Sequence, residues 1–336
     1  FTENRNDNGD EIVALKYGAD AGAVISQNSW GYTNVYEMPE ITKDAIDYFI
    51  EYAGLDENGV QVGPMKGGIV IFAAGNEERD YRSYPACYER VLSVSALAPD
   101  YRKSYYSNFS EWIDVAAPGG SYKYEGRYGD EYAVYSTLPG NAYGYMQGTS
   151  MACPHVSGVA ALGLSYALEK GKKFTLDEFK TMLLTSVNEI DSRLGEGSKA
   201  TIADVSIYRG KMGTGITDAY QLLMQIEGTP CLQVALGEVQ LIPLTQHFGQ
   251  GAEDLTYTDI QMSAKDMEKL GIKAAPKMYN GKLMIKCTKP GSAKIKVSAI
   301  AGGTKPGTGV VMGGMVITKE FAVIARSAGA ANGGWL

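Results

Sequence analysis

Histidine is scarce in this sequence: its 336 residues include two, His155 and His247, against 38 Asp and Glu residues. A reaction that needs an imidazole base has only these two to draw on. His155 follows Ser150 by five residues on one predicted helix, about 7.5 Å along its axis and on a different side, so it cannot reach that hydroxyl. We predict a packing role for His155 and a surface position for His247.

Cysteine is scarce as well. The four cysteines, Cys87, Cys153, Cys231 and Cys287, are 66, 78 and 56 residues apart. This spacing fits neither a dense disulfide framework nor paired zinc-binding knuckles, so we predict buried or half-buried thiols and no zinc. A bridge between Cys231 and Cys287 stays open, because spacing alone does not decide pairing.

The sequence also lacks an excess of positive charge and a long hydrophobic run. Lys and Arg number 31 and the net charge is -7, so no nucleic-acid-binding surface is predicted. The apolar runs Gly68–Ala74 and Val156–Leu164 are far shorter than the ~20 residues that cross a bilayer, so no membrane span is predicted. Phe1 is followed by nine polar or glycine residues, a start that does not resemble a signal peptide and favours the interior of a longer chain.

Alternating helix-like and strand-like segments over residues 12–226 predict an α/β fold, with a mostly parallel sheet flanked by helices. The continuous apolar character of Gly68–Ala74 predicts a strand buried on both faces. Helices are predicted over Glu40–Tyr52 and Ser150–Gly171.

After Gly228 the pattern changes to short alternating stretches separated by turn residues. This predicts a small all-β domain, an antiparallel sandwich. The predicted division is 1–227 for the α/β domain, 228–326 for the sandwich and 327–336 for a flexible tail.

A serine stands where a loop enters the long predicted helix, in the segment Gly148-Thr149-Ser150-Met151-Ala152-Cys153-Pro154-His155. We place Pro154 in the first turn of this predicted helix, where the missing N–H of a proline costs little. The positive end of the helix would stabilise negative charge that develops near the Ser150 hydroxyl. From these residues alone, a nucleophile and an N-capping serine are equally open.

Asn76 follows the buried strand at its carboxyl end, where parallel sheets expose functional groups. A side-chain N–H₂ at that place can donate to a negatively charged oxygen. An ordinary turn asparagine beside Gly75 is the alternative.

Together these segments resemble the nucleophile and oxyanion-hole segments of the subtilisin-like serine proteases, the subtilases. Further segments occur in the order that the family has: Tyr84-Pro85-Ala86, Asn108-Phe109-Ser110, Val115–Gly119 and Gly213–Ala219. The resemblance spans about residues 12–226. It implies a serine endopeptidase that cleaves polypeptides through an acyl-enzyme on Ser150, with Asn76 as oxyanion-hole donor.

The resemblance also implies a substrate site in two parts. One part is an edge segment that pairs with an extended peptide, and the other is a pocket for the side chain before the scissile bond, where an acidic group would favour a basic residue or remain solvated. The residues implied are Ser29, Trp30 and Gly31 in the edge segment, and Ala73, Ala74, Gly75 and Glu77 in the pocket.

One part of the family pattern is missing. Subtilases carry their catalytic aspartate and histidine before the substrate-pairing segment, and no Asp-Thr-Gly-like or His-Gly-Thr-His-like segment occurs here. We therefore expect an N-terminally truncated subtilase that is inactive in isolation, with the missing N-terminal segment as its partner.

Two alternatives remain open: a catalytically dead peptide-binding pseudoprotease, or an adhesion module carried by the β-sandwich. The sandwich loosely resembles the immunoglobulin-like or cadherin-like tails of secreted proteases. The family resemblance implies no required cofactor, a structural calcium ion without assignable ligands, and a secreted or cell-surface location.

Overall fold

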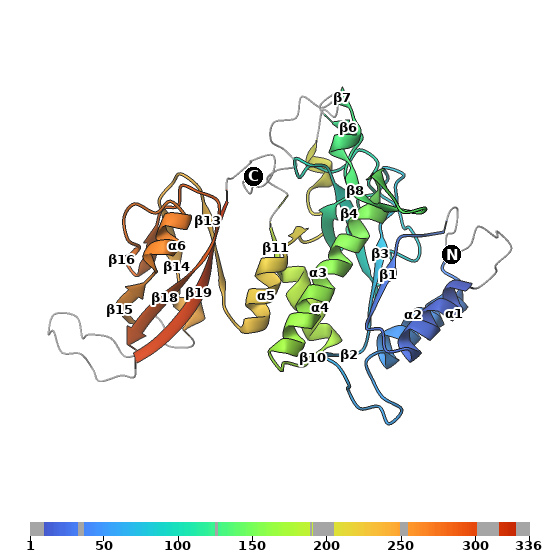
Figure 1. The fold of residues 1–336 in the computed structure, drawn as a ribbon, viewed down its shortest axis with the longest axis horizontal. Helices are drawn as coiled ribbons and strands as arrows, with labels where there is room; N and C mark the ends of the chain where they lie inside the picture. Colours follow the sequence, from blue (N-terminus) through green and yellow to red (C-terminus); the bar gives the residue numbers. More distant parts are fainter. Residues whose placement is uncertain are drawn as a thin grey trace. The chain divides into compact units, whose positions relative to one another are not determined.

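The computed structural model describes residues 10–32, 37–124, 127–188, 190, 205–248, 255–300 and 316–326. The chain forms two compact units, Phe1–Ile226 and Glu227–Leu336, whose elements are labelled in Figure 1. The sequence analysis placed the boundary one residue later, after residue 227.

Unit 1 is built on a six-stranded sheet with the order β1-β3-β4-β5-β12-β11. Neighbouring strands are parallel except β11 and β12, which are antiparallel. The predicted α/β fold with a mostly parallel sheet is therefore confirmed. The strands are β1 (Ile25–Asn28), β3 (Ile69–Ala73), β4 (Leu92–Leu97), β5 (Val115–Pro118), β12 (Ile216–Thr217) and β11 (Val187–Asn188).

Helices cover both faces of this sheet (Figure 1). β3 shows why: Ile69, Ile71 and Ala73 pack into the core that includes the long helix α3, whereas the alternate residues Val70 and Phe72 pack with α1 and α2. The strand is thus buried on both faces, as its unbroken apolar sequence predicts. The helices are α1 (Asp10–Asp20), α2 (Glu40–Tyr52), α3 (Thr149–Glu169), α4 (Leu176–Thr185) and α5 (Ala219–Glu227).

α3 lies against β1, β3, β4 and β5. Small residues on its buried face allow close packing: a side chain at Gly163 would lie 2.7 Å from Leu222 of α5. By length and composition alone α3 could cross a membrane. Its buried residues Ala152, Val156, Ala160 and Leu164 nevertheless belong to the core of unit 1, so it serves here as a core helix.

Short elements complete unit 1. The segment between residues 101 and 146 contains β5 and a hairpin, β8 (Val134–Leu138) and β9 (Ala142–Met146). The other short elements are β2 (Met65–Lys66), β10 (Phe174–Thr175), β6 (Lys123–Tyr124), β7 (Arg127–Tyr128), η1 (Asp130–Tyr132) and η2 (Val205–Tyr208).

Unit 2 contains a four-stranded sheet, β13-β19-β18-β15, and a three-stranded sheet, β14-β17-β16, over one apolar core. The longest ladder joins β18 to β19, with Ile295 opposite Phe321 at its centre. The elements are β13 (Cys231–Ala235), β14 (Gln240–Pro243), η3 (Thr245–His247), β15 (Thr256–Gln261), α6 (Ala264–Lys269), β16 (Lys277–Tyr279), β17 (Lys282–Ile285), β18 (Gly291–Ile300) and β19 (Val316–Arg326).

Two details of the predicted antiparallel all-β domain are wrong. β13 and β19 are parallel, because the strand that follows the boundary pairs with the last strand rather than with its neighbour in sequence. A short helix, α6, is capped by Ser263, whose side chain accepts from Asp266 N. The likeness to immunoglobulin-like or cadherin-like sandwiches stays a prediction, and the predicted tail, 327–336, lies outside the described residues.

The two cysteines of unit 2, Cys231 and Cys287, form no disulfide bond. Cys287 is a buried free thiol, so the Cys231–Cys287 bridge that the sequence left open is not formed. Burial raises the pKa of Cys287 to about 11, which keeps it protonated and unreactive at neutral pH.

Candidate functional site

Ser150 lies in the first turn of α3, a helix that begins at Thr149, directly after a glycine that the local backbone requires. Gly148 has φ +149°, a conformation that other residues rarely adopt. The Ser150 Oγ donates to the carbonyl oxygen of Ser29 at 3.4 Å, and the Ser29 Oγ donates to the Ser150 carbonyl at 2.7 Å. The half-buried Ser150 is thus tied to the segment that follows β1.

Asn76 lies in the loop after β3, and its side chain reaches the start of α3. The backbone N–H and the Oγ1 of Thr149 both donate to Asn76 Oδ1, each at 2.9 Å. The first N–H groups of a helix lack partners within it, so Asn76 caps α3. Because a backbone N–H can only donate, this contact fixes which way the amide points and leaves Nδ2 on the side away from Thr149.

These contacts bring Asn76 to the residue next to Ser150. The Ser150 N–H is one of the donors at the start of α3 that have no partner within the helix. A hydroxyl, an amide N–H₂ and a helix N-terminus therefore converge, at the carboxyl end of β3. Such a set can attack a carbonyl carbon and stabilise the negative charge that forms on its oxygen.

The sequence profile of the Peptidase S8 family, the subtilase family, matches residues 1–202. The chain belongs to the subtilase family. Its curated relatives include a thermophilic serine proteinase from Bacillus sp. (strain AK1), 42% identical over 106 residues, which cover 32% of this chain and 23% of that protein. Thermitase from Thermoactinomyces vulgaris is 32% identical over 148 residues, covering 44% of this chain and 43% of thermitase.

Solved structures of proteases show a partial likeness. The patellamide maturation protease PatA matches with a TM-score of 0.49 and 23% identity, over 65% of this chain and 68% of that one. The chain spans between 21% and 43% of the length of the curated relatives that it matches.

The edge segment implied by the subtilase resemblance lies beside the nucleophile only in part. Ser29 touches Ser150, as described above. Trp30 turns its ring the other way, where it packs edge-on against Phe72 at 5.1 Å and donates to Asn28 Oδ1 at 3.1 Å. Gly31 is exposed, and a side chain there would lie 3.3 Å from the Tyr84 carbonyl oxygen.

The four implied pocket residues differ in exposure. Ala73 and Ala74 are buried, and both backbone polar groups of Ala74 are used: its N–H donates to Val94 and its carbonyl accepts from Asn108. Gly75 is half-buried and Glu77 is exposed. Any direct contact with a substrate side chain would therefore be left to Gly75 and Glu77.

The predicted positions of both histidines are wrong. His155 is exposed because it lies on the side of α3 away from the sheet, and its Nδ1 contacts the Met151 carbonyl oxygen at 2.8 Å. His247 is half-buried, with its ring 5.3 Å from that of Phe321, and burial lowers its pKa. His155 still points to its own helix backbone rather than to Ser150.

A cavity of about 320 Å³ opens beside the nucleophile, between α3 and the β8–β9 hairpin. Met151, Pro154 and His155 line it from the helix, and Val134, Leu138 and Met146 are among the hairpin residues. Neither Ser150 nor Asn76 lines it. Within the described residues, no three His, Cys, Asp or Glu side chains gather as a metal site. The structural calcium ion stays a prediction.

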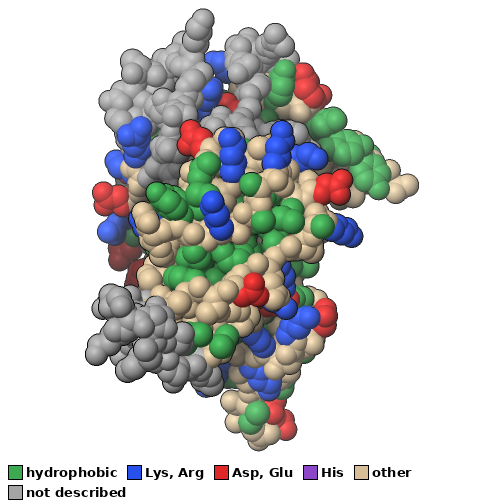
Figure 2. All heavy atoms as spheres, turned by 90° about the vertical axis from the view of Figure 1, so that its left-hand side faces the viewer, with side chains coloured by type: hydrophobic (Ala, Val, Ile, Leu, Met, Phe, Trp, Pro, Cys, Tyr) green, Lys and Arg blue, Asp and Glu red, His purple; other side chains and the backbone are tan. Residues whose placement is uncertain are grey.

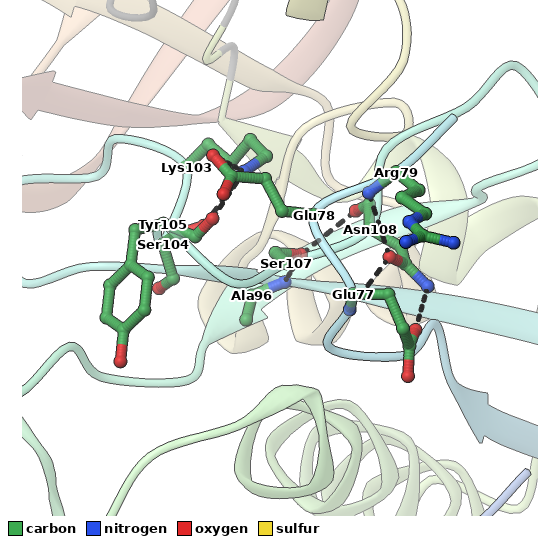
Figure 3. A network of polar contacts seen from close by, with 9 residues as sticks. All are labelled: Glu77, Glu78, Arg79, Ala96, Lys103, Ser104, Tyr105, Ser107 and Asn108. Atoms are coloured by element: carbon green, nitrogen blue, oxygen red, sulfur yellow. Dashed lines mark hydrogen bonds and ion pairs between the residues drawn. The ribbon is translucent and has the colours of Figure 1, made fainter. Parts of the chain in front are cut away.

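Sequence reasoning missed a polar network behind the Asn76 loop, drawn in Figure 3. Asn108 is fully buried and bonds to the loop from below. The Lys103 ammonium, its side chain 4% exposed, lies 4.0 Å from the Glu78 carboxylate and donates to the carbonyl oxygens of Ser104 and Tyr105 at 3.1 Å. Burial lowers the pKa of Lys103 to about 8. The sequence analysis noted the segment Asn108-Phe109-Ser110 as part of the family resemblance, but the segment indicated no role for Asn108.

Proposed function

We propose that this subtilase is a serine endopeptidase in which Ser150 attacks the scissile carbonyl of a polypeptide and forms an acyl-enzyme. Asn76 Nδ2 and the Ser150 N–H would hold the oxyanion of the tetrahedral intermediate. The observation that carries the proposal is the bond from Thr149 N–H to Asn76 Oδ1, because it aims the amide as a donor beside the nucleophile.

The proton acceptor is the part that these residues do not supply. A serine hydroxyl needs a general base to become a nucleophile at neutral pH. His155 is engaged with the backbone of α3, and His247 packs on Phe321 in the other unit. We propose that an aspartate–histidine pair on a polypeptide segment outside these 336 residues completes the site.

The experiment compares the 336-residue chain alone with the chain joined to the segment encoded upstream of it. The readouts are labelling of Ser150 by a fluorophosphonate and cleavage of a peptide library. We expect neither from the chain alone, and both from the longer protein. Ser150→Ala should abolish both, whereas Ser157→Ala, a buried serine of the same helix that donates to Cys153, should retain labelling.

Two outcomes would overturn this proposal. Fast labelling of the isolated chain would show that no outside base is needed. A longer protein that binds peptides but neither labels nor cleaves would favour the pseudoprotease alternative.

The cellular location and the role of unit 2 belong to this proposal as well. Among the relatives, one is named an extracellular basic protease, from Dichelobacter nodosus, and another a major intracellular serine protease, from Bacillus subtilis. We propose secretion, which detection of the protein in culture medium would test. We also propose that unit 2 is an accessory β-sandwich of this protease.

A further inference from the structure

The loop that carries Asn76 has no regular structure of its own to fix it. Residues 74–80 follow β3 without helix or strand, and Asn76, Glu77, Glu78 and Arg79 are exposed. An exposed irregular loop is normally among the mobile parts of a fold. Oxyanion stabilisation, by contrast, depends on donors that are held in place before the reaction.

A single buried side chain holds this loop from beneath. Asn108 Nδ2 donates to Ala74 O at 2.9 Å and to Glu77 Oε2 at 2.7 Å. Its Oδ1 accepts from Glu77 N and Arg79 N, each at 3.1 Å, and its backbone N–H donates to Gly75 O at 3.0 Å. A primary amide can donate two and accept two hydrogen bonds, so every capacity of the Asn108 side chain is used on the loop.

The loop backbone also lies in direct contact with this amide. Gly75 has φ +101°, and a side chain there would lie 2.3 Å from Asn108 Nδ2. Only glycine permits both the conformation and the approach. The position of the loop is therefore set by Asn108 through hydrogen bonds and through close packing.

We propose that Asn108 is a positioning residue, which holds Asn76 at the nucleophile without touching it. The inference rests on the oxyanion role proposed above for Asn76. The anchored residues flank Asn76 on both sides: Ala74 and Gly75 before it, Glu77 and Arg79 after it. With both flanks fixed, the Asn76 amide can meet Thr149 on one side and present Nδ2 on the other.

The same segment secures the loop at a further point. The N–H of Glu78 donates to Tyr106 O at 2.9 Å, and the Glu78 carboxylate faces Lys103 (Figure 3). Asparagine is required at the centre of this network. Aspartate has the same shape, but it would place an oxygen against Ala74 O and the Glu77 carboxylate, and alanine would leave Glu77 N and Arg79 N without acceptors.

The first test needs no catalysis and uses the 336-residue chain. Hydrogen exchange at the Thr149 amide reports whether Asn76 Oδ1 is in place, and Thr149 lies outside the Asn108 contacts. We expect Asn108→Ala and Asn108→Asp each to speed exchange at Thr149 by roughly 10-fold or more, because the acceptor shifts away. Asn188→Ala is the matched control: Asn188 is also buried and bonded, to Asp218, but far along the sheet from the loop.

Unchanged exchange at Thr149, together with faster exchange at Glu77 and Arg79, would overturn the proposal, because the loop would then be loosened without moving Asn76. If the alanine variant fails to fold, the aspartate variant, which keeps the volume, gives the same reading. A control variant that speeds Thr149 as much as the Asn108 variants would also count against it.

The second test uses the protease with its base supplied. We expect Asn108→Ala to lower kcat by roughly 10- to 100-fold with little change in KM, since it misplaces a donor that acts in the transition state. In an Asn76→Ala background the same substitution should cost less than about 3-fold, because its effect passes through Asn76. Full additivity would contradict the proposal. An inactive wild-type protein would instead reject the proposed function, and the exchange test would still decide the role of Asn108.

Discussion

The two units differ in how they use polar groups. Among the described residues, every buried polar or charged side chain except Thr229 lies in unit 1. Several of them, including Ser95, Ser107, Asn108 and Thr149, are fully buried behind the loops at the carboxyl ends of the strands. Unit 2 has an apolar core and long regular ladders instead. In unit 1, which carries the candidate site, buried side chains thus form hydrogen bonds that hold loops in place.

The two units also differ in charge. Residues 1–226 contain 19 Lys and Arg against 30 Asp and Glu, whereas residues 227–336 contain 12 against 8. Figure 2 shows one face with a central group of hydrophobic side chains, around which Lys and Arg side chains and some Asp and Glu side chains lie. The net charge of the whole chain hides this contrast.

The largest expected effect concerns the apolar core of unit 2. Phe321 is fully buried, and Phe321→Ala should lower the free energy of unfolding of unit 2 by about 3–5 kcal/mol, through lost transfer energy and a cavity. Hydrogen exchange on peptides from each unit measures the loss separately. Val316→Ala, on an exposed position of the same strand, should change it by less than about 0.5 kcal/mol. An equal loss in unit 1 would contradict the separation of the units.

The next effect is on activity rather than stability. In the protease with its base supplied, Asn76→Ala should lower kcat by about 100- to 1,000-fold, the loss known for oxyanion-hole donors of this family. Asn58→Ala, at an exposed turn of unit 1, is the control and should leave kcat unchanged. Steady-state kinetics on one peptide substrate measures both, and a loss below about 10-fold for Asn76→Ala would contradict the oxyanion role.

Lys103 tests the polar interior by its pH dependence. Its pKa is about 8 in the folded chain, against an ordinary 10.5. Between these values the unfolded chain holds the proton and the folded chain has lost it, so the Lys103 contribution to the free energy of unfolding rises with pH. The free energy of unfolding of wild type minus that of Lys103→Met should therefore become more positive from about pH 7 to about pH 10.

Urea denaturation at several pH values measures the Lys103 effect. A flat difference for Lys103→Met would mean that its ammonium is not desolvated.

The smallest effect is at the surface of unit 2. Lys294 pairs with Glu227 and Glu320, each at 2.9 Å, and its side chain is 41% exposed. Because solvent screens exposed pairs, Lys294→Met should cost no more than about 1 kcal/mol, and less at high salt. Thermal unfolding at two salt concentrations measures it, and a salt-independent loss would point to packing instead.

The elements that carry Ser150 and Asn76 were predictable because their signals are local. An unbroken apolar run gives β3, and a glycine before a loop-to-helix junction gives the start of α3. Thr175 carries a local signal of the same kind, because its side chain accepts from Glu178 N in a capping box at the start of α4. The five-residue spacing on one helix also predicted that His155 does not reach the Ser150 hydroxyl.

What sequence could not give depends on contacts between distant segments. Asn108 is 32 residues from Asn76, and nothing near it in sequence shows which loop its amide meets. The parallel pairing of β13 with β19 is hidden for the same reason, since alternation identifies a strand but not its partner. α6 has six residues, too few for a helical period to be recognised.

The resting contact of the nucleophile has one more consequence. The Ser150 hydroxyl donates to the main-chain carbonyl oxygen of Ser29 over 3.4 Å, near the outer limit for a hydrogen bond. Breaking so weak a hydrogen bond costs little free energy. In the proposed mechanism, an imidazole base would therefore meet little competition for that hydrogen.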